Sequence, residues 1–134
     1  MSKEIPTVQK YMSYDPFFIT AEKTVIEAQD LMKKHNIRHL PVLHDGEVIG
    51  ILSDRDIKLA MSLIQADAMI KAGYICHDHV YHVEPETHID QVAQVMAEKH
   101  YGCAVVLQNG KLVGIFTTVD ACRALAEISR QRSH

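Results

Sequence analysis

An internal repeat with an offset of 64 positions constrains this chain more than any other feature of its sequence. Residues Phe18–Ala60 align without a gap with His82–Ala124, and nine of the 43 aligned pairs are identical. Apolar positions and turn residues also correspond, as Ser53 does with Thr117. A gapless register of this length indicates duplication, so we expect two copies of one structural unit.

Each copy predicts the same order of elements: strand, helix, strand, strand, helix. The first strand is "FFIT" (17–20) in one copy and "YHVE" (81–84) in the other. An Asp-Gly dipeptide at 45–46 and an Asn-Gly dipeptide at 109–110 separate apolar runs, which is the strongest short-range signal for a β-hairpin. The second helix of each copy is predicted to begin directly after the hairpin.

The first helix of each copy has an apolar face at helical spacing, formed by Val25, Ala28, Leu31 and Met32 in one copy and by Ile89, Val92, Val95 and Met96 in the other. Thr24-x-x-Glu27 and Thr87-x-x-Asp90 both fit a capping box at the start of this helix. Outside the repeat, Met61–Tyr74 predicts an extension of the second helix and a link to the second copy.

These elements predict an α+β fold with tandem β-α-β-β-α repeats packed with pseudo-two-fold symmetry, which would leave two equivalent clefts between them. One copy of about 45 residues is close to the size at which a single core no longer stabilises a domain. We divide the chain into a first repeat at 1–74, with an N-terminal arm and the linker helix, and a second repeat at 75–134. Residues 1–12 are expected to form a helix or arm on the outside.

The composition places the chain among ordinary folded proteins and narrows its partners. A net charge of −3 argues against a general nucleic-acid binder. No apolar run approaches the roughly 20 residues that span a bilayer, and the first residues lack the apolar core of a secretory signal, so we expect a cytoplasmic protein. The three cysteines Cys76, Cys103 and Cys122 have wide spacings, which favour buried or half-buried thiols over disulfides.

A glycine, a hydroxyl residue and an aspartate recur at the start of the second helix in both copies, in "GILSDRD" and "GIFTTVD". An aspartate can accept hydrogen bonds from both vicinal hydroxyls of a ribose. A hydroxyl residue at a helix start lies beside free N–H groups, which favour an anion. The same Ser53-x-x-Asp56 and Thr117-x-x-Asp120 spacing also fits a helix cap that needs no ligand.

The two copies together resemble a pair of CBS domains, also called a Bateman module. The resemblance rests on "VQKYMSYDPFFITAEKTVIEAQDLMKKHNIRHLPVLHDGEVIGILSDRDI" and on the weaker "HVEPETHIDQVAQVMAEKHYGCAVVLQNGKLVGIFTTVDA". It covers nearly the whole chain and leaves little room for a catalytic domain. It implies a regulatory, nucleotide-binding module that holds AMP, ADP, ATP or S-adenosylmethionine in the clefts, forms a homodimer and acts on a partner protein, without a required cofactor.

The resemblance also implies the residues of the site. Asp56 and Asp120 would hold ribose hydroxyls, and Ser53 and Thr117 would lie near phosphate. The set assigned to ligand binding is Ile19, Thr20, Arg38, His39, Pro41, Ser53, Arg55, Asp56, His82, Val83, Thr117, Thr118 and Asp120.

The two sites are expected to be unequal. Arg38 and His39 would reach phosphate in the first site, with Arg55 and Lys58 nearby, whereas the repeat places Gly102, Cys103, Val119 and Cys122 at the matching positions of the second.

Two other interpretations compete with nucleotide binding. The stretch "CHDHVYH" (76–82) contains potential metal ligands, but no second cluster completes a set, and we assign no metal. We also expect no enzyme, because neither a nucleophile elbow nor a P-loop is present. The remaining alternative is an interaction or dimerisation module without a nucleotide ligand.

Overall fold

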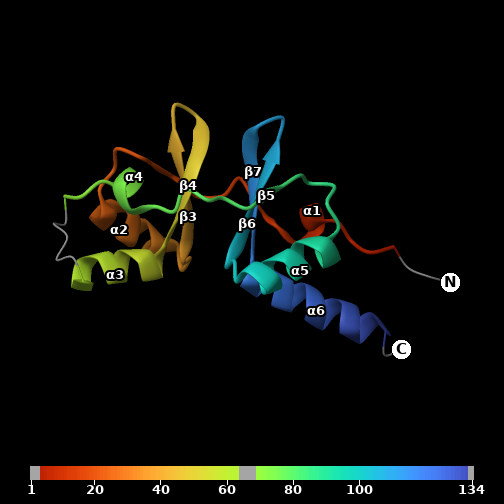
Figure 1. Cartoon of the computed structure of the whole chain (residues 1–134). Helices are drawn as coiled ribbons and strands as arrows, with labels where there is room; N and C mark the ends of the chain where they lie inside the picture. Colours follow the sequence, from red (N-terminus) through yellow and green to blue (C-terminus); the bar gives the residue numbers. More distant parts are fainter. Residues whose placement is uncertain (1–3, 64–68, 133–134) are drawn as a thin grey trace. The chain divides into compact units, whose positions relative to one another are not determined.

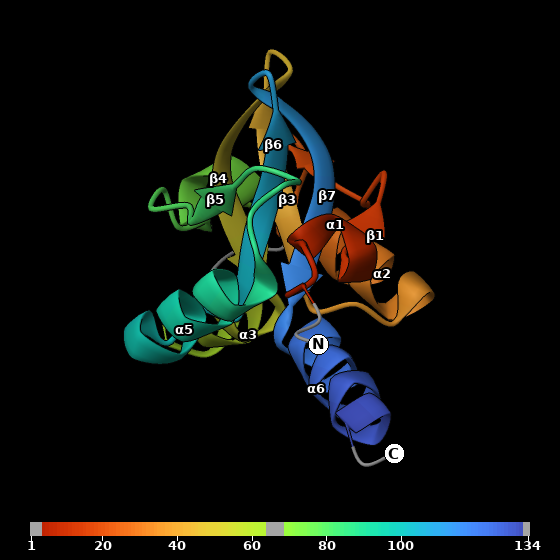
Figure 2. The ribbon, with the colours of Figure 1, turned by 90° about the vertical axis from the view of Figure 1, so that its right-hand side faces the viewer.

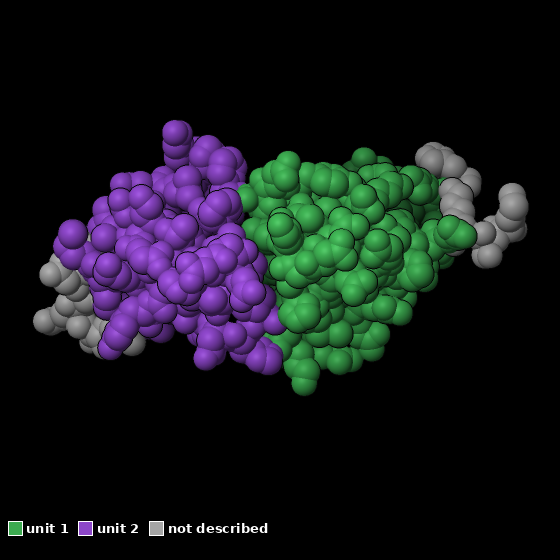
Figure 3. All heavy atoms as spheres, turned by 90° about the horizontal axis from the view of Figure 1, so that it is seen from above, with its two compact units in different colours: residues 1–16, 81–134 green, residues 17–80 purple. Residues whose placement is uncertain are grey.

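The computed structural model describes residues 4–63 and 69–132 of the chain (Figure 1). They form two compact units (Figure 3). One unit contains residues 17–80, and the other combines the N-terminal segment through Pro16 with the chain from Tyr81 onward. The N-terminal segment therefore belongs to the unit of the second repeat, although the sequence-based division groups it with the first.

The unit of residues 17–80 contains a three-stranded sheet in the order β2-β3-β4. The short strand β2 pairs in parallel with β3, and β3 pairs in antiparallel with β4. In chain order its elements are β2 (Ile19–Thr20), α2 (Val25–His35), β3 (His39–His44), β4 (Glu47–Ser53), α3 (Asp54–Leu63) and α4 (Ala72–Ile75).

The other unit contains a four-stranded sheet in the order β1-β7-β6-β5. Its short helix α1 packs beside β7 and α6 (Figure 2). In chain order its elements are α1 (Val8–Tyr11), β1 (Ser13–Tyr14), β5 (His82–Val83), α5 (Ile89–Lys99), β6 (Cys103–Gln108), β7 (Lys111–Thr117) and α6 (Thr118–Arg132).

The predicted α+β class and the strand–helix–strand–strand–helix order of each copy are confirmed. Both hairpins turn at the predicted dipeptides, where both turn residues have positive φ: +50° and +82° at Asp45 and Gly46, and +53° and +77° at Asn109 and Gly110. Two consecutive residues of this kind form the tight turn that suits the twist of a hairpin.

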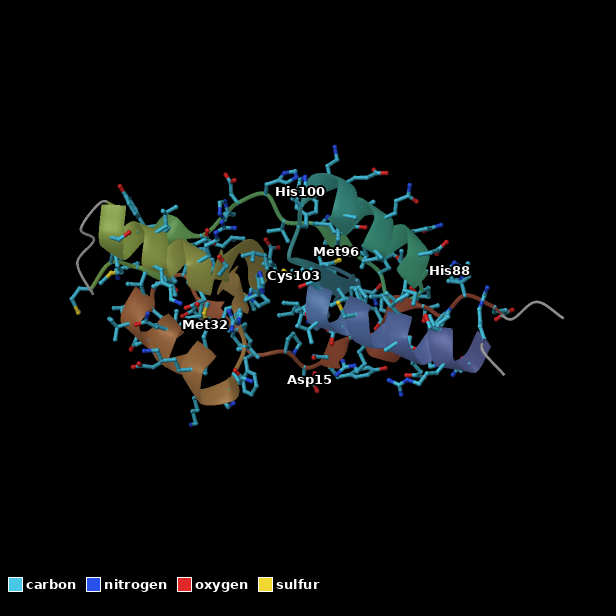
Figure 4. The ribbon with its side chains drawn as sticks, turned by 90° about the horizontal axis from the view of Figure 1, so that it is seen from below. Asp15, Met32, His88, Met96, His100 and Cys103 are labelled. Carbon is cyan, nitrogen blue, oxygen red and sulfur yellow. The ribbon has the colours of Figure 1, made fainter. Side chains whose placement is uncertain are left out.

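The predicted apolar faces of α2 and α5 form the centres of two hydrophobic cores. Val25, Ala28 and Met32 are buried in one, and Ile89, Val92 and Met96 are buried at the matching positions of the other. Figure 4 labels Met32 and Met96, which keep only 2% and 4% of their surface exposed.

One of the two predicted capping boxes is wrong. Thr24 and Glu27 form the expected reciprocal pair at the start of α2. In α5 the N-cap is His88, which makes no side-chain cap bond, and the Thr87 hydroxyl instead accepts a hydrogen bond from the Glu84 N–H at 3.3 Å. The repeat itself explains the difference, because its offset aligns Thr24 with His88 and not with Thr87.

The structural repeat begins earlier than the sequence alignment indicates. Helices α1 and α4 are related by the same 64-residue offset, and each is followed by a segment that pairs with the hairpin of its own unit. Val8 is fully buried, so the expectation that the N-terminal helix lies outside the core is wrong. Of the predicted linker helix, α3 is described as far as Leu63, and residues 64–68 lie outside the described residues.

The three cysteines differ in exposure. Cys103 is buried and Cys76 is half-buried, as expected, but Cys122 is exposed on α6, which contradicts the prediction for that residue.

Within residues 4–63 and 69–132, no helix is long and apolar enough to cross a membrane.

Candidate functional site

The aspartate of the first repeat lies at the junction between β4 and α3. Strand β4 ends at Ser53, and the backbone turns directly into the helix. The Ser53 N–H donates to Asp56 Oδ2 at 3.0 Å, and the Asp56 N–H donates to Ser53 Oγ at 3.0 Å. This reciprocal pair is a helix cap, and it fixes the carboxylate by one of its two oxygens.

The second oxygen of Asp56 faces a histidine from another part of the unit. His77 Nε2 lies 2.8 Å from Asp56 Oδ1. His77 is held there because its N–H and carbonyl both bond to Ile51 at 2.9 Å, as in an antiparallel strand pair. We call Ser53, Asp56 and His77 the Asp56 cluster. His77 belongs to the stretch at 76–82 in which the sequence shows potential metal ligands.

His39, another of the predicted phosphate-binding residues, lies beside this cluster. It begins β3, directly opposite Ser53 in the register of the hairpin. Burial lowers the pKa of His39, and the negative charge of Asp56 opposes this effect only in part. His39 is therefore neutral at pH 7 while no anion is bound.

The predicted cations of the first repeat are arranged unequally. Lys58 forms an ion pair with Asp54 at 3.0 Å, one turn along α3, so it is already engaged. Arg38 and Arg55 are exposed, and neither side chain forms an ion pair with another residue in the described part of the chain. The Arg38 carbonyl accepts the Asp54 N–H at 2.9 Å, which places residue 38 beside the start of α3.

Five of the other residues assigned to ligand binding lie on strands of the two sheets. Ile19 and Thr20 form β2, which pairs with β3 on the side opposite to β4. Pro41 is buried on β3. His82 and Val83 form β5, which pairs with Val105 and Val106. His82 is exposed and Val83 is buried.

The aspartate of the second repeat is more deeply buried. Asp120 keeps 5% of its surface exposed. Its Oδ2 accepts hydrogen bonds from the Thr117 N–H at 2.9 Å and the Thr117 hydroxyl at 3.1 Å, while the Asp120 N–H donates to Thr117 Oγ1 at 3.3 Å. Thr118 begins α6, and its N–H donates to the Gly102 carbonyl at 3.1 Å. The cap of the first repeat is thus reproduced in the second.

Arg123 supplies a cation that the sequence-based reading of the second site missed. Its Nη2 forms a short ion pair with Asp120 Oδ1, and the same atom lies 3.5 Å from the Tyr11 carbonyl oxygen. The spacing of aspartate and arginine three residues apart on one helix was a readable signal, because such residues share a helix face. We call Thr117, Asp120 and Arg123 the Asp120 cluster.

The two clusters share one chemical property. In each, Oδ2 of the aspartate is fixed by the cap, while Oδ1 lies beside a side-chain nitrogen. A carboxylate fixed in this way is a rigid acceptor for a hydroxyl-bearing ligand, with the N–H groups of a helix start beside it for an anion. In the described part of the chain, no group of three or more histidine, cysteine, aspartate or glutamate side chains could hold a metal ion.

Comparison with known proteins supports the resemblance found in the sequence. The family model for the CBS domain matches residues 1–63 and 72–127. The CBS domain-containing protein YhcV of Bacillus subtilis is 27% identical over 138 residues, which cover 96% of this chain and 99% of that protein. Hypoxic response protein 1 of Mycobacterium tuberculosis is 29% identical over 123 residues, covering 90% of this chain and 86% of that protein.

A solved structure shows a similar fold with ligands bound. It is the CBS domain pair of protein MJ0100 in complex with 5′-methylthioadenosine and S-adenosyl-L-methionine. The TM-score is 0.85 at 25% identity, and the similarity covers 92% of this chain and 98% of that one.

Proposed function

Because this chain belongs to the CBS-domain family, we propose that it is a regulatory module that binds adenosine-containing ligands and signals their presence to a partner protein. The proposed ligands are AMP, ADP and ATP, with S-adenosylmethionine as a further member of the class. The proposal assigns no catalytic residue. It places the ligand contacts at the Asp56 cluster and the Asp120 cluster.

The observation that carries the proposal is the repeated geometry of the two aspartates. Each carboxylate is fixed by its cap through Oδ2, so Oδ1 is held in place without the entropy cost of ordering a free side chain. A ribose presents two adjacent hydroxyl donors, and a fixed carboxylate can accept both. The ligands of the CBS domain pair of MJ0100 both contain adenosine, which supports a ribose as the group recognised here.

The other assigned residues would contact the adenine base and the phosphate of the ligand. Ser53 and Thr117, with Thr118, lie at the starts of α3 and α6, where the helix dipole favours an anion. Arg38 and Arg55 are exposed cations without an ion-pair partner among the described residues, so they are available to a phosphate. His39 would gain a proton when a phosphate approaches, because an anion favours the charged form of the ring.

Calorimetric titration of the purified protein tests the proposal directly. We expect at least one of AMP, ADP, ATP and S-adenosylmethionine to bind. Asp56→Ala or Asp120→Ala should weaken binding about tenfold to a hundredfold, because a charged acceptor of a hydrogen bond is lost. Asp30→Ala, which removes an exposed aspartate of α2, is the control for a change in charge.

Circular dichroism of each variant separates lost binding from lost folding. If none of the four ligands binds at millimolar concentration to the folded protein, nucleotide sensing is wrong, and the alternative of an interaction module without a nucleotide takes its place.

A homodimer is the second part of the proposal, and one surface feature favours it. A groove of ≈ 400 Å³ in the unit of the second repeat is lined by Ile5, Pro6, Ile89, Ala93, Leu125 and Ile128, together with other apolar and polar residues. Leu125, one of these lining residues, keeps 67% of its surface exposed. Burying such apolar surface against a second copy would stabilise a dimer.

Light scattering coupled to size-exclusion chromatography tests the dimer. We expect a dimer for the wild-type chain and a monomer for Leu125→Glu. Tyr74→Glu changes a side chain of the other unit that is 78% exposed, and this variant should remain dimeric. A wild-type monomer at high concentration would refute the dimer without affecting the proposal for the ligand.

A further inference from the structure

One guanidinium group joins the ligand-binding aspartate of the second repeat to the N-terminal helix. Arg123 Nη2 contacts both Asp120 Oδ1 and the carbonyl oxygen of Tyr11. Tyr11 is the last residue of α1, and carbonyls in the last turn of a helix have no partner within the helix. Residues 11 and 123 are far apart in the sequence, but both belong to the same compact unit.

The described residues of the first repeat make no equivalent contact. The position that matches Arg123 is Leu59, and Asp56 Oδ1 is occupied by His77 instead. The matching short helix α4 therefore has no arginine that joins it to Asp56. Among the described residues, this connection between aspartate and short helix is present only in the unit of the second repeat.

Helix α1 has an apolar anchor but little polar support from α6. Val8, Tyr11 and Met12 are buried in the core of the unit. The ion pair between Lys10 and Glu127 is 4.0 Å long, with both side chains about half exposed, and such pairs contribute little to stability. The bond from Arg123 is thus a polar contact whose loss would loosen α1 without removing its hydrophobic anchor.

A ligand at Asp120 competes for this arginine. Because Thr117 holds Oδ2, the carboxylate oxygen open to exchange is Oδ1, where Arg123 now lies. A ribose hydroxyl that donates to Oδ1 displaces the guanidinium. An anionic group on the same ligand then offers Arg123 a new partner, since arginine binds phosphate in a fork geometry.

We infer that Arg123 couples occupancy of the Asp120 cluster to the packing of α1: an anionic adenosine ligand draws Arg123 away from both Asp120 and the Tyr11 carbonyl, and α1 loosens. This inference rests on the proposed function. It adds a residue that selects for a charged ligand, and it names the element through which occupancy of this cluster is transmitted. Differential contacts of this kind are what a ligand needs in order to shift an equilibrium between two states.

Hydrogen exchange of the α1 amides measures the coupling. The Met12 N–H bonds to the Val8 carbonyl at 2.9 Å and reports on the opening of the helix. In the ligand-free protein, Arg123→Met should raise its exchange roughly threefold to tenfold, the range expected for one hydrogen bond. Lys99→Met removes an exposed positive charge from α5, and it should leave the exchange of the Met12 amide unchanged.

Saturating AMP should raise the exchange of the same amide in the wild type and have no further effect in Arg123→Met. Calorimetry gives a second readout. The preference for AMP over adenosine should fall about tenfold in Arg123→Met, because the phosphate loses its partner while adenosine no longer competes with a guanidinium. If Arg123→Met does not fold, the same measurements are made on Arg123→Lys, which keeps the positive charge.

The outcomes separate the inference from the function on which it rests. AMP binding that depends on Asp120 but leaves α1 exchange and the ligand preference of Arg123→Met unchanged would overturn the coupling and leave the binding proposal standing. Absence of AMP and adenosine binding to the folded wild type would overturn both.

Discussion

His77 Nε2 lies 2.8 Å from Asp56 Oδ1 and contacts this oxygen as Arg123 Nη2 contacts Asp120 Oδ1. His77 and Arg123 nevertheless do not stand at matching positions of the repeat. Position 77 matches Ser13, and position 123 matches Leu59. The two units therefore occupy the same carboxylate oxygen with side chains from different elements. A ligand that took this oxygen would displace an imidazole in one unit and a guanidinium in the other, so the two aspartates have different surroundings.

The cap and the histidine contact at Asp56 should contribute differently to stability. Ser53→Ala removes the hydroxyl that accepts the Asp56 N–H, and we expect it to lower the free energy of unfolding by about 1 kcal/mol. His77→Ala removes a side-chain contact whose histidine is 70% exposed, and it should cost less than that. Urea denaturation measures both. A larger loss in His77→Ala than in Ser53→Ala would mean that the histidine, and not the cap, holds the aspartate.

The close approach of backbone at Gly50 and Gly114 should give these matched glycines different tolerances. A Cβ at residue 50 would lie 2.6 Å from both Cys76 Sγ and the His77 carbonyl oxygen, and the carbonyl is fixed by its pairing with Ile51. Gly50→Ala should therefore destabilise the protein by about 1–3 kcal/mol. At residue 114 the obstacle is the side chain of Met12, which is flexible, so Gly114→Ala should cost less.

A double-mutant cycle checks this explanation. Gly114→Ala should cost less in a Met12→Ala background than in the wild type, because the obstructing side chain is gone. Cys76→Ala should not rescue Gly50→Ala, because the backbone oxygen of His77 remains. Full rescue by Cys76→Ala would show that the thiol alone restricts position 50.

The parts of the fold that the sequence predicts are those with a local signal. Turn dipeptides, helical spacing of apolar residues and the hydroxyl–aspartate pairs each involve residues within a few positions of one another. The wrong capping box at Thr87 has a local origin too, because threonine is a preferred N-cap residue and only the repeat register indicates that His88 has this position instead.

The parts that it does not predict depend on contacts between distant residues. Nothing near Val8 indicates that it packs in the unit of the second repeat, because its partners lie more than seventy positions away, as the bond from the Val8 N–H to the Thr87 carbonyl shows. The role of Arg123 is half local and half distant: its spacing from Asp120 could be read, but its contact with Tyr11 could not.

The three thiols should react in a fixed order with a maleimide or a disulfide reagent. Cys122 is exposed and should be modified first. Burial raises the pKa of the half-buried Cys76 thiol, and it raises the pKa of Cys103 to about 12, so both contain less of the reactive thiolate at pH 7. Mass spectrometry of peptides at short reaction times gives the order. Labelling of Cys103 before Cys122 in the folded protein would contradict the buried position of residue 103.

His39 should make the stability of the free protein and its affinity for phosphate respond to pH in opposite directions. Burial lowers the pKa of His39 below its ordinary value of 6.5, with Asp56 opposing the shift in part. As the pH falls below 6.5, the unfolded chain takes up this proton before the folded protein does, so the contribution of His39 to the free energy of unfolding decreases. At higher pH both states are neutral at this residue, and the contribution is constant.

Binding of a phosphate beside His39 reverses the sign, because the anion raises the pKa of the ring in the complex. The contribution of His39 to AMP affinity should therefore increase between pH 7 and pH 6, and adenosine affinity should lack this contribution. His39→Gln should remove the contribution of residue 39 to both pH dependences, and His77→Gln serves as the matched control for the other histidine near Asp56. Calorimetry at each pH, together with urea denaturation of the free protein, supplies the two profiles. An AMP affinity that still rises to the same extent in His39→Gln would place the titrating group elsewhere and remove His39 from the phosphate contacts.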